Sequence, residues 1–191
     1  MDRETFEKYL ENNAKDIVMI SEFAYILHDI DVNQKYDDKP YSYHLKSVFD
    51  LAKKYGHLVI EKEDDILPVL FAASYHDSIE DARLTYNDVM KIAKKKMTDE
   101  QAYLATEIVY ALTNEKGRNR DERANYKYYE GIRITKYAPF VKMCDRLANM
   151  TYSASKGSSM IEKYKSELPH FLSMIGQDNI PIEMIECVNK L

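Results

Sequence analysis

Three places in the sequence set metal-binding side chains among apolar residues. His44 lies in YSYHLKSV, the pair His76-Asp77 lies in AASYHDSIED, and Asp145 lies in VKMCDRLAN. Burying an ionisable group without a partner is costly, so these polar groups call for a shared explanation. One divalent cation, held by two imidazoles and two carboxylates, would supply it. Such a set leaves coordination positions open for water and a substrate oxygen, as catalytic metal sites do.

Two further carboxylates follow the His-Asp pair. Glu80 comes four residues after His76, and Asp81 comes four residues after Asp77, which on a helix is one turn along the same face. Carboxylates there could orient or deprotonate a water molecule, or protonate a leaving oxygen. Asn149 lies one turn after the last aspartate and offers both a donor and an acceptor. The alternatives are a solvated helix face for the acidic pair and a local hydrogen bond for the asparagine.

Helices must position these groups. Apolar residues between Phe6 and Ile30 recur at steps of three and four, which predicts one helix, or two with a break near Asn12-Asn13. A polar stretch at 31–40 interrupts the pattern. The next helix is predicted over Ser42 to Tyr55 and ends at Gly56. Further helices are predicted from Asp64-Asp65 through VLFAASYHD to a break at 83–85, over 86–96, 98–113, 121–136, 138–155 and 159–174, and in the last segment from Ile182.

Composition supports an all-α fold. The 191 residues include only five glycines and five prolines, where average usage would give about 13 and 10. Few turn residues indicate long elements, and no segment alternates strictly between apolar and polar residues. The length suits one domain. We expect a motif-bearing core at about 20–155, with C-terminal helices at about 159–191 packed on it.

The sequence also limits the cellular compartment and the binding partners of the protein. Its longest apolar run, ILPVLFAA at 66–73, is far shorter than a membrane span, and two cysteines are too few for a disulfide framework. We therefore expect a cytoplasmic protein. The net charge of −5 argues against a nucleic-acid partner. The segment 115–136 nevertheless holds seven basic and four acidic residues, a net charge of +3, which suits phosphate groups.

Taken in order, the motifs resemble a known family. His44, HDSIED and DRLANM, with LTNEK at 112–116 and Glu-Arg at 122–123, resemble the HD-domain metal-dependent phosphohydrolases. The string is most similar to the hydrolase domain of RelA/SpoT proteins and to stand-alone small alarmone hydrolases. The similarity spans about residues 20–155. It implies an all-helical HD-domain bundle.

The resemblance also implies a metal and its ligands. The family binds one metal ion, usually manganese, and the matching ligands here are His44, His76, Asp77 and Asp145. Two imidazoles and two carboxylates also suit iron, cobalt or zinc. Glu80 and Asp81 match the acidic pair that serves the attacking water, so they are the expected catalytic residues. By the same resemblance, the expected substrate-binding residues are Lys35, Lys116, Arg123 and Asn149.

The activity implied is removal of the 3′ pyrophosphate from the alarmone (p)ppGpp, a reaction of the stringent response. Two alternatives stay open. One is an HD-type phosphatase or nucleotidase acting on another nucleotide such as NADPH, and the other is a nucleotide-sensing module without catalysis. Outside the motifs, we expect His28, His57 and His170 at the surface or its boundary, and Cys144 buried and inert.

Overall fold

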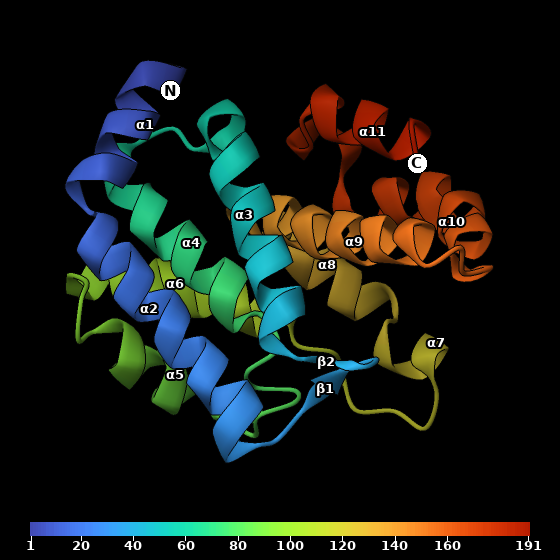
Figure 1. The fold of residues 1–191 in the computed structure, drawn as a ribbon, viewed down its shortest axis with the longest axis horizontal. Helices are drawn as coiled ribbons and strands as arrows, with labels where there is room; N and C mark the ends of the chain where they lie inside the picture. The colour runs from blue at the N-terminus through green and yellow to red at the C-terminus, as the bar shows by residue number, and fades with distance from the viewer.

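The computed structural model covers residues 1–191, and its description of side chains leaves out residues 120 and 121. The chain folds as a helical bundle with a single pair of very short strands in the described structure, so the predicted all-α class is confirmed (Figure 1). None of the helices in the described chain is long and apolar enough to cross a membrane.

The N-terminal region forms two helices, which is the second of the two predicted alternatives. Helix α1 (Arg3–Asn12) begins at Asp2, whose carboxylate accepts from the Thr5 amide, and α2 (Ala14–Ile26) follows after a break at Asn13. The chain continues into a π-helical turn, η1 (Leu27–Asp31). The polar stretch that follows is not a plain loop: β1 (Lys35–Tyr36) pairs antiparallel with β2 (Lys39–Pro40).

Helix α3 (Ser42–Val59) is longer than predicted, because it runs through Gly56 instead of ending there. The reason is packing. A Cβ atom at Gly56 would lie 2.7 Å from Cζ of Phe6, so glycine allows α1 and α3 to approach closely. After the 3-10 turn η2 (Glu63–Asp65), α4 (Ile66–Tyr75) is buried along its whole length. Helix α4 ends at Tyr75, earlier than predicted, and residues 76–81 form consecutive turns.

The remaining helices follow the predicted order. Helices α5 (Tyr86–Ala93) and α6 (Asp99–Leu112) each begin with a capping box. The predicted helix at 121–136 is divided into α7 (Arg120–Arg123) and α8 (Tyr126–Ile134), because Asn125 caps α8 with its side chain. Helix α9 (Ala138–Ser155) has the predicted bounds. It is followed by α10 (Met160–Ile175), η3 (Gln177–Asn179) and α11 (Ile182–Asn189).

One hydrophobic core joins these elements, with members from Phe6 to Val188. Helix α3 packs against α4 and α9, while α2 and α6 also contact α4. The two C-terminal helices, α10 and α11, both pack on α9 (Figure 1). This packing brings the start of α3, the segment after α4 and the middle of α9 together.

Candidate functional site

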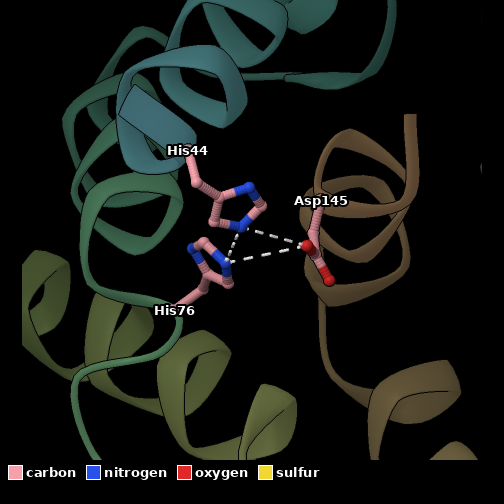
Figure 2. A group of neighbouring side chains, drawn as sticks. All are labelled: His44, His76 and Asp145. Atoms are coloured by element: carbon pink, nitrogen blue, oxygen red, sulfur yellow. Dashed lines mark hydrogen bonds and ion pairs between the residues drawn. The ribbon is translucent and has the colours of Figure 1, made fainter. Parts of the chain in front are cut away.

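Three of the predicted metal ligands point toward one another (Figure 2). His44 lies in the first turn of α3, His76 directly follows α4, and Asp145 lies in the middle of α9. Nε2 of His44 is 3.3 Å from Nε2 of His76 and 3.3 Å from Oδ1 of Asp145. Both histidines are almost fully buried, with side-chain exposures of 3% and 2%. The three groups could hold one metal ion.

Asp77 adds the fourth predicted ligand to this group. Its Oδ2 lies 2.9 Å from Nε2 of His76 and 3.7 Å from Nε2 of His44. The hydroxyl of Tyr41 donates to the same oxygen. Asp77 therefore lies beside the three groups that could hold a metal ion, in contact with both histidines.

The spacing of the donors fits a bound cation. Ligand atoms at about 2.0–2.2 Å from one ion, at the angles of tetrahedral or octahedral coordination, stand about 2.8–3.6 Å apart. Three separations in the group, between 2.9 and 3.3 Å, fall in this range, whereas Nε2 of His44 to Oδ2 of Asp77 at 3.7 Å and Nε2 of His76 to Oδ1 of Asp145 at 3.9 Å are longer. Nδ1 of His76 lies 3.0 Å from the carbonyl oxygen of Ala73. A proton donated there leaves Nε2 free to bind the ion.

The electrostatics of the group also favour a cation. Burial lowers the pKa of His76, but the neighbouring carboxylates of Asp77 and Asp145 together outweigh burial and raise this pKa to about 9. Burial raises the pKa of Asp145, whereas Lys142 and the two histidines lower it more strongly, so the carboxyl titrates well below its usual range. The carboxylates thus place negative potential at the histidines, while Asp145 already has Lys142 as a partner at 2.9 Å.

The acidic pair is arranged differently from the helical prediction. Because α4 has already ended, Glu80 and Asp81 lie on turns, although the Asp81 amide still bonds the carbonyl of Asp77 at 2.8 Å. Oδ2 of Asp81 accepts from Nε2 of Gln34 at 2.8 Å and from the Tyr41 hydroxyl at 3.2 Å. Asp81 is therefore held in place close to the ligand Asp77.

Glu80 faces a different partner. Its side chain is exposed, and both carboxylate oxygens accept from Nδ2 of Asn114 at 2.8 Å. Asn114 belongs to the LTNEK stretch that follows α6. The two carboxylates therefore differ in surroundings: one is fixed inside the site, and the other stands at its edge, open to solvent.

A hydrogen-bonded chain behind Asp81 was missed from sequence. His28 is fully buried, which corrects its expected surface or boundary position. Its Nδ1 lies 2.7 Å from Oε1 of Gln34, and its ring stacks on Tyr41 at 5.0 Å between centroids. Burial lowers the pKa of His28. Of these residues, only Tyr41 lies close in sequence to a predicted ligand, three positions before His44.

The expected substrate-binding residues lie at different depths. Nδ2 of Asn149 donates to Oδ1 of Asp145 at 2.7 Å, and its own Oδ1 accepts from the Tyr36 hydroxyl at 2.7 Å. Lys35 is exposed on β1, and its neighbour Tyr36 enters the site instead, with its ring stacked on His44 at 4.9 Å. The hairpin therefore places an aromatic side chain against the candidate ligand His44.

Two cavities flank the ligands. The first, here the basic cavity, has a volume of 150 Å³ and is lined by Arg123, Lys142, Asp145, Arg146 and Asn149 among others. The second, here the aromatic cavity, has a volume of 320 Å³ and is lined by Tyr36, Tyr43, His44 and Tyr152 among others. A larger cavity of 510 Å³ between the ends of α3 and α8 and the segment 178–183 contains none of the predicted site residues.

The basic segment 115–136 reaches the site only in part. Of its basic residues with described side chains, Arg123 lines the basic cavity, and Arg120 lies outside the described side chains. Lys116 is exposed on the connection between α6 and α7 and lines neither of the two cavities as described. Lys142 and Arg146, on α9, supply the cavity's other positive charges.

Comparison of the chain with protein-family models, with curated proteins and with solved structures finds no match. The geometry of the site and the motif pattern therefore carry the functional argument.

Proposed function

We propose that the protein is a metal-dependent phosphohydrolase of HD type that acts on a phosphorylated nucleotide, with removal of the 3′ pyrophosphate of (p)ppGpp as the expected reaction. The observation that carries this proposal is the meeting of His44, His76 and Asp145 at one point that could hold a metal ion, with Asp77 in contact with both histidines. Buried charges need this kind of compensation, and a divalent cation provides it.

These four residues would hold the cation, with manganese as the expected ion on the resemblance. A cation there lowers the pKa of a water molecule and offsets phosphate charge. Asp81, fixed by Gln34 and Tyr41, accepts hydrogen bonds beside the ligands. Glu80 is exposed and can exchange a proton with water or with a leaving oxygen. The acidic pair therefore suits turnover better than passive sensing.

The two cavities support a nucleotide as the substrate class. In the aromatic cavity, the rings of Tyr36 and Tyr152 lie 4.8 Å apart between centroids, and Tyr43 lies 5.7 Å from Tyr152. Aromatic side chains stack on nucleobases with little dependence on the base. The basic cavity borders the same ligand set and suits phosphate. A substrate with a base at one end and phosphate at the other matches both.

The decisive assay incubates manganese-loaded protein with ppGpp and separates the products by ion-exchange chromatography. We expect GDP and pyrophosphate in the loaded sample and neither in a chelator-treated control. No product above the chelated control would rule out the alarmone reaction.

A second candidate is a phosphatase or nucleotidase that acts on another nucleotide such as NADPH. Lys35 and Lys116 were both expected to recognise the alarmone, but both are exposed and neither lines the aromatic cavity, which favours this second candidate. The tyrosines of that cavity can stack on any base. A panel of phosphorylated substrates with manganese would separate the two candidates. Tight binding without product in a single-turnover experiment would instead support a sensing module.

A further inference from the structure

Helix α2 carries apolar side chains on its outward face as well as on the face that packs against α4. Met19, Phe23 and Ile26, with Ile30 in the turn η1, are 40%, 45%, 52% and 71% exposed. They follow one another at steps of four, three and four residues, which is the spacing of the seam positions of a coiled coil. Exposed apolar residues gathered in this way are typical of a surface that binds a partner. We call these four residues the α2 stripe.

One edge of the α2 stripe is mainly basic. Nζ of Lys95, in the turn after α5, lies 5.6 Å from the centroid of the Phe23 ring. Lys96 lies on the same edge, with its Nζ 3.0 Å from Oδ1 of Asp16. The side chain of Asp16 is still 45% exposed, so it can accept from a second donor. This edge therefore offers an ammonium group beside Phe23 and a carboxylate two turns earlier.

The other edge of the α2 stripe has the opposite pattern. Six residues separate Asp16 from Glu22, a rotation of about 120° around a helix, so the two flank the stripe on opposite sides. Burial, with smaller contributions from Asp50 of α3 and from Glu22, raises the pKa of Tyr25 to about 12, which places Glu22 on the side toward α3. Lys15, exposed seven residues before Glu22, lies two turns along the same edge.

The two edges complement each other, so the surface fits a second copy of itself. A two-fold axis that runs along α2 sets opposite edges side by side. Glu22 then lies level with Lys95 of the second copy, and Lys15 lies level with Asp16 of the second copy. A perpendicular two-fold axis would instead set like edges together. Charges that flank an apolar seam set the orientation of paired helices in this way.

We infer that two copies of this chain associate through α2, with their α2 stripes packed together in parallel. This inference does not depend on the proposed function. The charges also favour a second copy over a lipid surface. Helices that lie on membranes are rich in Lys and Arg on their polar face, whereas anionic headgroups would repel the exposed Glu22 beside this stripe.

Sedimentation velocity of the full chain over a range of concentrations tests the association. We expect a dimer whose population rises with concentration. Ile26→Asp should raise its dissociation constant at least about tenfold, because it buries a carboxylate in the seam. Ile182→Asp is the matched control and should dimerise like the wild type. That side chain is 59% exposed and lies on α11, which packs on α9.

Exchanging the charges tests the parallel arrangement. Glu22→Lys and Lys95→Glu should each weaken the dimer, because each sets like charges side by side. The double variant should regain the affinity, because the two charges then meet again with opposite sign. Both positions are exposed, so the variants should fold, and circular dichroism checks that they do. High salt should reduce the differences among them.

A wild type that is monomeric at every concentration would overturn the inference, and so would equal dissociation constants for Ile26→Asp and the wild type. A double charge variant that dimerises no better than the single ones would overturn the parallel pairing. If Ile26→Asp does not fold, the charge exchange decides alone. Monomeric protein that co-sediments with phosphatidylserine vesicles would show that the stripe binds a membrane surface instead.

Discussion

At the scale of single residues, the ligand set depends on side chains that are not themselves ligands. Tyr41 donates from one hydroxyl toward both Asp77 and Asp81, and Gln34 adds a second donor to Asp81. Residues that orient metal ligands in this way commonly tune affinity and activity. The chain from His28 to Asp77 therefore belongs to the site.

Tyr41→Phe removes the hydroxyl while leaving a ring to stack on His28. We expect hydrolysis to slow by about 10- to 100-fold at saturating manganese, the usual range for losing a partner of a metal ligand. The measurement is kcat together with metal content by elemental analysis. Tyr55→Phe, further along α3 and lining neither of the two cavities as described, is the control and should behave like the wild type. Equal rates in the two variants would show that the hydroxyl has no functional role.

Asp77→Ala and Glu80→Ala should separate metal binding from proton transfer. Asp77 lies within the donor group, so its loss should abolish both bound metal and activity. Glu80 is bonded to Asn114 at the edge of the site, so Glu80→Ala should keep the metal and slow hydrolysis by about 100-fold or more. Elemental analysis with rate measurements tests both. Unchanged metal content in Asp77→Ala would count against the ligand assignment.

At the scale of elements, helix ends and close contacts decide where the site residues lie. Because α4 stops at Tyr75, His76 and Asp77 lie on a turn whose side chains both reach the ligand group. Gly56 lies inside α3 and does not end it. Its missing side chain makes room for the ring of Phe6 against the helix. The start of the same helix carries His44.

Gly56→Ala should destabilise the fold by about 1–3 kcal/mol, because its methyl group would overlap the ring of Phe6 in a packed core. Gly131→Ala is the matched control. Nothing lies within 4 Å of a Cβ at this position inside α8, so alanine should stabilise the helix by about 0.5–1 kcal/mol. Denaturant unfolding of both variants gives the free energies. An unchanged free energy in Gly56→Ala would contradict the packing argument.

At the scale of the whole molecule, the site joins segments that are distant in the chain. The ligands come from α3, from the turns after α4 and from α9, and the π-turn η1 places His28 behind them. Folding must bury the imidazole of His28 at the same time. The stability of the whole fold is therefore linked to the protonation of this group.

The contribution of His28 to stability should fall as the pH decreases through about 6.5. The pKa of His28 is below its ordinary value of 6.5 in the folded protein because of burial, so below that pH the unfolded chain binds more protons. The free energy of unfolding should then decline by at most about 1.4 kcal/mol per pH unit from this group. His28→Gln should flatten the profile between about pH 7 and 5, whereas His170→Gln should not. Parallel profiles for all three proteins would disprove the linkage.

Much of the fold and the ligand set was readable from sequence. The bounds of α9 were predicted, and the break at Asn13 was one of two predicted alternatives, because apolar periodicity and breaker residues act locally. His44, His76 and Asp145, which the structure brings together, could be singled out because each stands in a short motif among apolar residues, where a histidine or an aspartate is unusual. The hairpin at 35–40 and the early end of α4 were not identified, because tertiary contacts set both.

The amino-acid sequence by itself determined the all-α class and the side chains that meet at the candidate metal site. Only the tertiary structure decided which groups surround them. His28 became a buried partner of Gln34, and Arg146 became part of a cavity wall beside Asp145. The physical reason is that these relations depend on how α2, α9 and α10 pack together, and packing between distant segments leaves no period or spacing in the sequence.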